Sequence, residues 1–185
     1  ADGIADEETY HPNPADLYSA TKISAEFIGR QFAESFDLDF RICRLYFIYG
    51  PGRFPSRFIP LYRIAFGALE GIEGLTSEKG ADQQLDFTHV EDAARGIVLL
   101  YTAGHLKHRL FNIATGIPHS VGDVVERTRK HTHFPVPVAV GPGTLMPRCL
   151  ALNIDRAKSE LGFEPKYSLD AGIRQYADWI KSHRK

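Results

Sequence analysis

The chain has 185 residues, of which 43% are hydrophobic and 24% charged, a composition typical of a globular domain. Its 22 Lys and Arg nearly balance its 23 Asp and Glu, which leaves a formal net charge of −1. This balance excludes the basic stripe that nucleic-acid binding requires, so we expect no nucleic-acid partner. The apolar runs are far shorter than the ~20 residues of a membrane helix, so we expect no membrane partner either.

The chain contains two cysteines, Cys43 and Cys149, far apart in the sequence. They have no metal-ligand spacing, which excludes a zinc ribbon or a disulfide scaffold and favours the reducing cytoplasm. No metal site is predicted. The chain begins with Ala1 in a loop-like stretch, so we expect it to be the later part of a longer protein.

In chain order, the first predicted elements are a long helix and a strand. Asn13 and Pro14 form a helix-start signal, and apolar residues then recur at three- to four-residue spacing, which predicts a helix over 14–36. Residues 40–49 are rich in β-branched and aromatic types and predict a strand. The strand stops at Gly50-Pro51-Gly52, which predicts a loop.

Shorter elements follow these two. Periodicity and capping signals predict helices at 58–69, 91–103, 120–131, 154–161 and 169–183, and strands at 85–90 and 110–114. The stretch 134–147, rich in Pro and Gly, is predicted to be a linker. Strands that alternate with helices predict an α/β layered fold with mostly parallel pairing.

Tyr18 and Lys22 lie four residues apart on the predicted 14–36 helix, so they share one face about one turn apart. Such a pair suits proton transfer. A phenol titrates near pH 10, so action as a base near pH 7 requires roughly 4 kcal/mol of preference for the phenolate, which a nearby cation helps to supply. The spacing alone is weak evidence, because such pairs also arise by chance.

Five blocks in order carry a resemblance to a known family. They are Pro14 to Glu26, Arg44 to Arg53 (RLYFIYGPGR), Asp86 to Ala94 (DFTHVEDAA), Phe111 to Gly116 (FNIATG), and Leu161 to Ile173. Together they resemble the extended short-chain dehydrogenase/reductase group, the NAD-dependent epimerase/dehydratase family, over residues 8–180.

The resemblance implies the C-terminal part of a Rossmann-like doubly wound parallel sheet plus a small α/β substrate-binding region. Residues 1–70 would end the dinucleotide-binding domain, and residues 71–185 would mostly form the substrate-binding region. The implied function is NAD(P)-dependent oxidation or reduction at a secondary alcohol of a sugar-like substrate. The resemblance also implies a homodimer formed through the 14–36 helix.

Residue roles are implied only where this sequence matches the family. Tyr18 would be the general acid/base, and Lys22 would stabilise its phenolate and bind the cofactor ribose. Tyr46 and Ile48 would lie beside the nicotinamide of NAD or NADP, although core packing explains Ile48 equally well. His89 and Asp92 are better explained as structural residues near a helix N-terminus.

Two departures from the family pattern bear on the substrate. Phe47 and Leu85 stand where nucleotide-sugar members commonly have Asn and an Arg that binds the diphosphate. Because an aliphatic side chain does not replace a bidentate cation, we expect a substrate without a nucleotide diphosphate, such as a sugar acid. The alternative is that Arg53, Arg57 or Arg148 binds the diphosphate instead. The predicted substrate-binding residues are thus Phe47, Arg53, Leu85 and Arg148.

The Gly-rich fingerprint that holds the cofactor pyrophosphate is absent, because Gly50-Pro51-Gly52 is followed by Pro55 in place of a third glycine. We therefore expect no tight binding of NAD, and no activity, by this chain alone. The rival hypothesis is a cofactor-free module for interaction or dimerisation through the 14–36 helix. Phe27, Phe32 and Phe36 on that helix are explained by helix-face packing or by an oligomer face.

Overall fold

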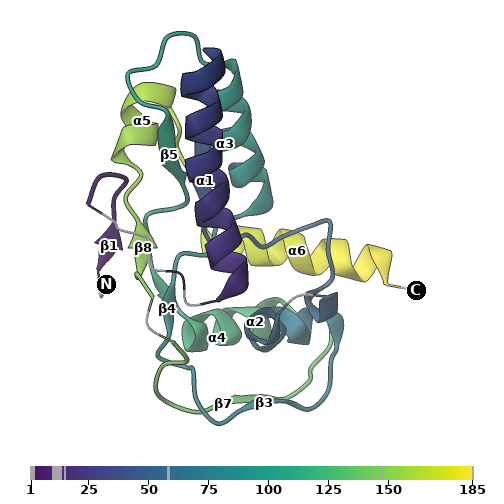
Figure 1. Ribbon diagram of the computed structural model, residues 1–185. Helices are drawn as coiled ribbons and strands as arrows, with labels where there is room; N and C mark the ends of the chain where they lie inside the picture. Colours follow the sequence, from purple (N-terminus) through teal and green to yellow (C-terminus); the bar gives the residue numbers. More distant parts are fainter. Residues whose placement is uncertain (1–2, 10–13, 15, 58, 147, 185) are drawn as a thin grey trace.

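A computed structural model describes residues 3–9, 14, 16–57, 59–146 and 148–184. Its α-helices are α1 (Leu17–Phe36), α2 (Pro60–Glu70), α3 (Val90–Thr102), α4 (Val121–His131), α5 (Asp155–Leu161) and α6 (Leu169–His183). Its strands are β1 (Ile4–Ala5), β2 (Ile42–Leu45), β3 (Leu75–Ser77), β4 (Gln84–Leu85), β5 (Leu110–Ile113), β6 (His119–Ser120), β7 (Val138–Val140) and β8 (Ala151–Leu152). The short 3-10 helix η1 covers Pro55–Arg57. Figure 1 shows strands and helices alternating along the chain, so the predicted α/β class is confirmed.

The described strands pair two by two. Three pairs are parallel (β1–β8, β2–β5 and β3–β7), and β4–β6 is antiparallel. The prediction of mostly parallel pairing is therefore confirmed. In the β2–β5 pair, Ile42 lies opposite Leu110 and Leu45 opposite Ile113. Helix α3 lies in the connection between these two strands, as the crossover between parallel strands requires.

Local signals placed most helix ends correctly. Ser120 caps α4, and its hydroxyl accepts the Asp123 N–H at 3.1 Å, as the sequence predicted. The start of α1 was predicted wrongly. The helix begins at Leu17 because the Asp16 carboxylate, rather than an Asn13 cap, accepts the Ser19 N–H at 2.7 Å. Asn13 itself lies outside the described residues.

Two predicted strands are shorter than the sequence indicated. β2 stops at Leu45, and Phe47 then adopts a positive φ of 32°, which takes the chain out of the extended conformation. Tyr49 forms a single parallel bridge with His89. Of the predicted 85–90 strand, only Leu85 belongs to β4.

The predicted linker at 134–147 is wrong, because it contains β7, which pairs with β3. Val138 lies opposite Leu75, and Val140 lies opposite Ser77. The partner strand is distant in the sequence, so no local pattern announces the pairing. The Pro and Gly residues on either side of β7 instead limit it to three residues.

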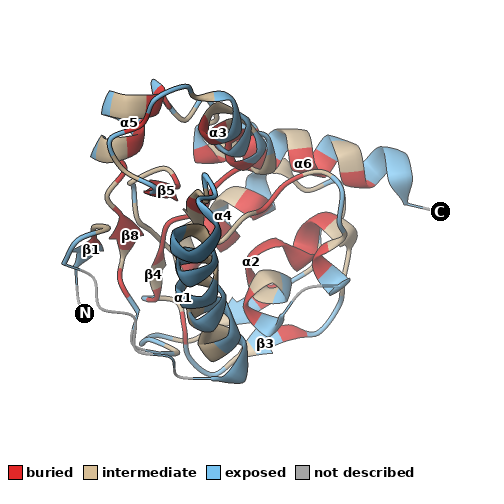
Figure 2. Cartoon of the chain, turned by 45° about the horizontal axis from the view of Figure 1, so that its top comes forward, coloured by how far each residue is buried: buried red, intermediate tan, exposed pale blue. Residues whose placement is uncertain are grey.

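The hydrophobic core is centred on α2, α4 and α6, which pack on one another. Phe66 on α2, Val124 on α4 and Ile173 on α6 are all fully buried. The Thr128 hydroxyl donates to the Ala65 carbonyl at 2.9 Å and so joins α4 to α2. Figure 2 shows the buried side of these helices facing inward.

Helix α1 differs from the other described helices because it has no buried residue. Most of its surface is exposed in Figure 2. Four large apolar side chains on it, Phe27, Ile28, Phe32 and Phe36, are between 55% and 68% exposed. The helix is tied to β2 by Glu26, which accepts two N–H bonds from Arg44 at 2.8 and 2.9 Å. The phenylalanines therefore do not pack into the core of this chain.

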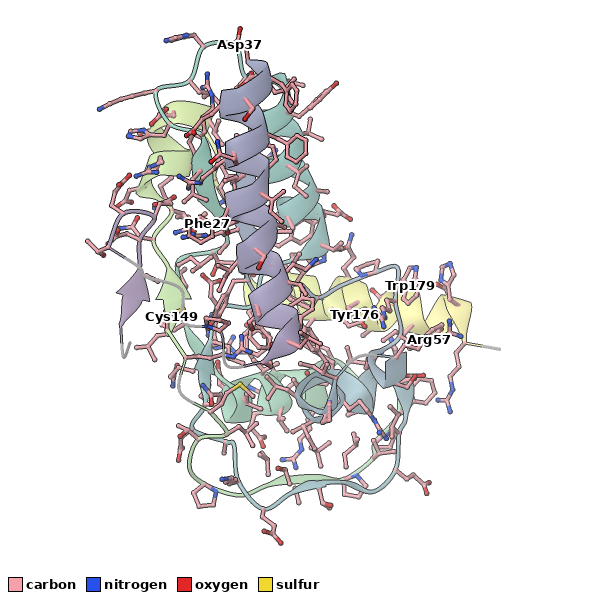
Figure 3. All side chains as sticks on the ribbon, in the orientation of Figure 1. Phe27, Asp37, Arg57, Cys149, Tyr176 and Trp179 are labelled. Atoms are coloured by element: carbon pink, nitrogen blue, oxygen red, sulfur yellow. The ribbon has the colours of Figure 1, made fainter. Side chains whose placement is uncertain are left out.

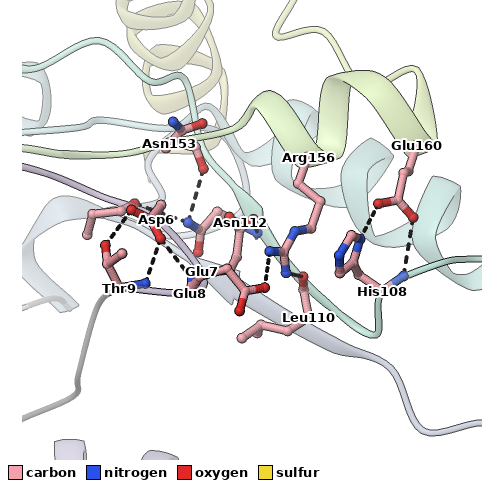
Figure 4. Close-up of polar contacts among 11 residues, drawn as sticks. Asp6, Glu7, Glu8, Thr9, His108, Leu110, Asn112, Asn153, Arg156 and Glu160 are labelled. Carbon is pink, nitrogen blue, oxygen red and sulfur yellow. Dashed lines mark hydrogen bonds and ion pairs between the residues drawn. The ribbon is translucent and has the colours of Figure 1, made fainter.

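The segment that contains β1 is held by polar contacts, drawn in Figure 4. The Asp6 carboxylate accepts the Thr9 N–H at 2.7 Å. The amide nitrogen of Asn112 donates to the carbonyls of Asn153 at 3.0 Å and Ala5 at 3.2 Å. A buried side chain of β5 thereby links β1 to the residue that follows β8.

Gly172 on α6 lies against the ring of Tyr49. A Cβ added at Gly172 would lie 2.1 Å from the Tyr49 hydroxyl oxygen and 3.0 Å from Cδ2 of His89. Both neighbours are buried, so neither has room to move. Glycine is thus required here by close approach.

We expect Gly172→Ala to lower the free energy of unfolding by about 1–3 kcal/mol through overpacking. The loss should appear although alanine favours a helix by about 1 kcal/mol over glycine. Urea unfolding followed by circular dichroism measures it. Gly104→Ala is the matched control, because nothing lies within 4 Å of a Cβ there. Equal stability of the Gly172→Ala and Gly104→Ala variants would contradict the packing argument.

Candidate functional site

Tyr18 and Lys22 lie on the first turns of α1. The Lys22 ammonium is 5.2 Å from the centroid of the Tyr18 ring, so the predicted one-turn pairing is present. Both side chains are exposed, Tyr18 by 71%. A phenol and an ammonium therefore stand together where a small molecule has access to them.

Tyr62 on α2 connects Tyr18 with a second group of predicted residues. Its ring stacks on Phe47 with centroids 5.6 Å apart. Burial raises the pKa of Tyr62, and both the Arg148 guanidinium and the Tyr18 phenol lie within electrostatic reach of it. Tyr18 and Arg148 therefore both influence the Tyr62 phenol, whose ring packs on Phe47. Cys149, the neighbour of Arg148, is labelled in Figure 3.

A small hollow brings together three of the four predicted substrate-binding residues. Phe47, Leu85 and Arg148 line it, together with Leu61, Gln83, Leu145 and Met146. The Arg148 guanidinium lies over the Phe47 ring, 5.4 Å from its centroid. Leu85 is fully buried, so it gives the hollow an apolar wall and no polar group.

Arg53, the fourth of these residues, does not line the hollow. It lies in the loop after β2, and that loop is fastened to α6. Its carbonyl accepts the Tyr176 hydroxyl, and the ring of Phe54 lies 5.1 Å from that of Trp179. Figure 3 shows Tyr176 and Trp179 on α6, with Arg57 of η1 at the same end of the molecule.

Tyr46 and Ile48, predicted to contact a cofactor, flank Phe47. Tyr46 is buried, and its hydroxyl donates to the Cys149 carbonyl at 2.5 Å. Burial raises the pKa of this phenol. Ile48 is half-buried. The Tyr46 hydroxyl therefore already has a hydrogen-bond partner within the chain.

His89 and Asp92 have structural contacts. His89 is the N-cap of α3, and its Nδ1 accepts the Glu91 N–H at 3.3 Å. The Asp92 carboxylate accepts the backbone N–H groups of Lys166 at 2.9 Å and Tyr167 at 3.0 Å. It thereby holds the segment before α6 against the start of α3.

Gln83, which lines the hollow, and Tyr62, which packs beside it, were not predicted as site residues from the sequence. Gln83 is buried, and its side-chain oxygen accepts the N–H groups of Leu145 and Met146, both at 3.1 Å. Tyr62 stacks on Phe47. The helical periodicity that predicted α2 placed Tyr62 on a helix, but no local pattern indicated what its ring would contact.

The structure has no helix that begins at a Gly-rich turn among the described residues. The N-caps of α1 to α6 are Asp16, Ile59, His89, Ser120, Ile154 and Ser168. The Gly50-Pro51-Gly52 turn leads only into the three-residue η1. The described residues also contain no group of His, Cys, Asp and Glu suited to a metal ion, and no helix long and apolar enough to cross a membrane.

Comparison with known proteins gives consistent matches. The model of the NAD dependent epimerase/dehydratase family matches residues 1–114. The dTDP-glucose 4,6-dehydratase of Shigella flexneri is 28% identical over 182 residues, which are 93% of this chain and 49% of that protein. The UDP-glucose 4-epimerase of Corynebacterium glutamicum is 31% identical over 84% of this chain and 51% of its own length. The chain thus spans about half the length of these curated relatives.

Solved structures match over nearly the whole chain. A UDP-glucose 4-epimerase from Thermotoga maritima, solved with UDP-glucose, gives a TM-score of 0.85 at 25% identity, over 100% of this chain and 59% of that one. MoeE5, in complex with UDP-glucuronic acid and NAD, gives a TM-score of 0.82 at 28% identity, over 98% of this chain and 60% of that one. The fold described above is therefore shared with these proteins.

Buried His89 should make the stability of the chain depend on pH. Its burial lowers its pKa from the usual 6.5, against the opposing charges of Glu91 and Asp92. Below pH 6.5 the His89 side chain therefore binds a proton more readily in the unfolded chain than in the folded chain. The free energy of unfolding consequently falls as the pH decreases below that value. His89→Asn keeps a cap acceptor and does not titrate, so its stability should fall less steeply.

Urea unfolding at pH 7.5, 6.5 and 5.5 measures this slope. The exposed His105, changed to Asn, is the control and should leave the slope unchanged. Equal slopes of the free energy of unfolding against pH for the wild-type chain and His89→Asn would contradict this role of His89.

Proposed function

Because this chain belongs to the NAD dependent epimerase/dehydratase family, we propose that it supplies the proton-transfer residues of an NAD-dependent reaction at a secondary alcohol of a sugar. The observation that carries the proposal is the pairing of Tyr18 with Lys22 on the exposed start of α1. Epimerisation, dehydration and net dehydrogenation all begin with oxidation of this alcohol. The choice among them depends on the substrate.

Tyr18 is the proposed acid/base. Its phenolic oxygen takes the proton of the substrate hydroxyl as the carbon loses a hydride, and it returns a proton in the reverse step. The Lys22 ammonium, 5.2 Å from the ring centroid, stabilises the negative charge on the phenolate. The pair works as a unit because both side chains project from one helix face.

The residues present fit one end of NAD. Lys22 and Tyr18 offer an ammonium and a hydroxyl to the nicotinamide ribose, and Tyr46 and Ile48 are proposed to lie beside the ring. When bound, NAD supplies the hydride acceptor. No described helix begins at a Gly-rich turn, so the usual contact of helix N–H groups with the pyrophosphate is not provided by these residues.

Phe47, Leu85 and Arg148, which line the small hollow, are the proposed substrate contacts. Tyr62 supports this assignment, because its ring stacks on Phe47 and Tyr18 influences its pKa. Arg148 is proposed to bind a negatively charged group of the substrate. Arg53 is proposed only as a peripheral contact, because its loop is fastened to α6.

A second candidate function is an interaction module that works through α1, as in a homodimer. It is favoured by the absence of any buried residue on α1 and by the exposed Phe27, Ile28, Phe32 and Phe36. A long helix with so much exposed apolar surface marks an interaction site. The two candidates are compatible if an active protein containing this chain is a dimer.

In an active protein that contains this chain, we expect Tyr18→Phe to lower kcat by at least about 100-fold, because it removes the proton acceptor and no packing volume. Lys22→Ala should lower kcat and also raise the KM for NAD. Tyr101→Phe, at an exposed tyrosine on α3, is the control and should be neutral. Near wild-type turnover by Tyr18→Phe across pH 6 to 9 would refute the role.

The 185-residue chain by itself should bind NAD at millimolar affinity or not at all. The ribose contacts alone are expected to contribute only a few kcal/mol net of the cost of association. Isothermal titration calorimetry measures the affinity. A dissociation constant below about 10 μM would show that the chain holds the pyrophosphate in another way.

If α1 is an interaction surface, the chain should self-associate, and Phe32→Glu should make it monomeric, because a buried unpaired carboxylate is costly. Sedimentation equilibrium at several concentrations gives the mass. Arg30→Glu, at an exposed position on the same helix, is the control for added charge. A monomeric wild-type chain, or a Phe32→Glu chain that still associates, would count against self-association through α1.

A further inference from the structure

Glu26 lies one helical turn after Lys22 on α1. Residues four positions apart in a helix are neighbours on one surface, with Cβ atoms about 5–6 Å apart. Lys22 therefore has two potential partners, the Tyr18 ring one turn before it and the Glu26 carboxylate one turn after it. The carboxylate attracts an ammonium more strongly than a neutral phenol does, because it carries a full negative charge. Within α1 alone, nothing would keep Lys22 beside Tyr18.

The structure nevertheless places the Lys22 ammonium over the Tyr18 ring, 5.2 Å from its centroid. In the described part of the chain, Glu26 forms its ion pair with Arg44 of β2 and none with Lys22. The Arg44 Nε and Nη2 atoms donate to the two carboxylate oxygens at 2.9 and 2.8 Å, so each oxygen has a charged donor. The Lys22 ammonium is thus left to Tyr18.

Arg44 is a better partner for Glu26 than an ammonium on α1 itself. Its guanidinium offers two parallel N–H groups to the two carboxylate oxygens, a geometry that an ammonium does not match. The side chains of Arg44 and Glu26 are only 18% and 22% exposed, so their attraction is screened less than that of a surface pair. Lys22 is exposed, so its pairing with Glu26 would be the weaker one.

Arg30, one turn after Glu26, is the other cation that helix geometry brings near this carboxylate. It is exposed, and within the described residues Glu26 forms no ion pair with it either. If Arg44 released Glu26, Lys22 and Arg30 would compete for the carboxylate. The experiment below therefore removes Arg30 first.

We propose that Arg44 is a positioning residue for the proton-transfer pair, because by binding both oxygens of Glu26 it keeps this carboxylate from drawing Lys22 away from Tyr18. This inference rests on the proposed roles of Tyr18 and Lys22 and extends them to a residue on another element. The ion pair that ties α1 to β2 thus also decides where the Lys22 ammonium stands.

The first test is NMR spectroscopy of the ¹³C,¹⁵N-labelled 185-residue chain carrying Arg30→Gln. Protons above an aromatic face are shifted upfield, so the ε-CH₂ protons of Lys22 report its position over Tyr18. Tyr18→Leu gives the position of these signals without the ring. Adding Arg44→Gln should remove most of the upfield shift, and adding Glu26→Gln as well should restore it.

A matched variant controls for the loss of a carboxylate. Glu34→Gln removes an exposed carboxylate of α1 that lies about three turns beyond Lys22. Introduced in place of Glu26→Gln, it should leave the Lys22 signals of the Arg44→Gln chain without their upfield shift.

Salt separates this mechanism from a loss of support for α1. An exposed Lys22–Glu26 pair is screened at about 1 M NaCl, so salt should return the Lys22 signals of the Arg44→Gln chain toward their upfield position. A helix that has only loosened from β2 would keep Lys22 over Tyr18, because both residues lie on α1. A helix that has unfolded would not regain this contact in salt. Amide chemical shifts of α1 show whether it stays helical.

The second test is turnover by an active protein that contains this chain and carries Arg30→Gln. Arg44→Gln should lower kcat about ten-fold, the loss expected when one nearby charge no longer favours the phenolate. Glu26→Gln should recover most of that loss in the same protein. A purely structural ion pair is absent from both variants and would give no recovery of the Lys22 signals.

Several results would overturn the proposal. They are a Lys22 signal that is not shifted upfield before Arg44 is changed, an unchanged shift in folded Arg44→Gln, no recovery with Glu26→Gln, or equal recovery with Glu34→Gln. If Arg44→Gln does not fold, Arg44→Lys, which keeps the charge without the two parallel donors, must still reduce the shift. The NMR measurement needs neither cofactor nor turnover, so failure of the Tyr18 role would leave its result unaffected. Its own failure would leave the Tyr18 role standing.

Discussion

The placement of Tyr49 is the constraint on which the centre of this molecule depends. Its ring stacks on Phe66 at 5.0 Å and meets His89 edge-on at 5.5 Å, while Gly172 approaches its hydroxyl. Its backbone pairs with the segment around His89: its N–H donates to the Thr88 carbonyl, and its carbonyl accepts the Val90 N–H. The first turn of α3, the side of α6 and the end of the β2 loop therefore all meet at one residue.

This anchoring explains the strain at Phe47. The chain leaves β2 at Leu45 and must reach the fixed position of Tyr49 within four residues. The left-handed conformation of Phe47 accomplishes the bend, and its ring packs against those of Tyr46, Tyr62 and Phe87. The geometry of the hollow thus follows from core packing, because the same bend that satisfies Tyr49 places the Phe47 ring under Arg148.

Much of the fold was predictable because it rests on local signals. Ser120 at the start of α4 and Gly162 after α5 are visible in the sequence, and the structure uses them as caps. The start of α1 was missed because Asn13 and Asp16 are both good cap residues, and local propensity does not choose between them. β7 was missed because three residues become a strand only when β3 lies beside them.

The candidate site likewise has features that the sequence predicts and features that it does not. Tyr18 and Lys22 pair through helix geometry alone, so their proximity was predictable from spacing. The contact of Phe47 with Arg148 joins residues about a hundred positions apart in the sequence, and the resemblance to a family gave their roles but not their contact. The full burial of Leu85 was also not evident, because its neighbours in sequence are polar.

The pairing of β1 with β8 has a consequence for how the chain acquires its structure. Ile4 lies opposite Ala151, and Ala5 opposite Leu152, so the first strand finds its partner near the end of the chain. Contacts of such long sequence separation carry a large loop-closure entropy and form late in folding. On the ribosome, β1 emerges before β8 and stays without this partner until residue 152 has been synthesised. Among the described strand pairs, β1 therefore waits longest for its partner during synthesis, and its short length of two residues limits the risk of wrong pairing during that interval.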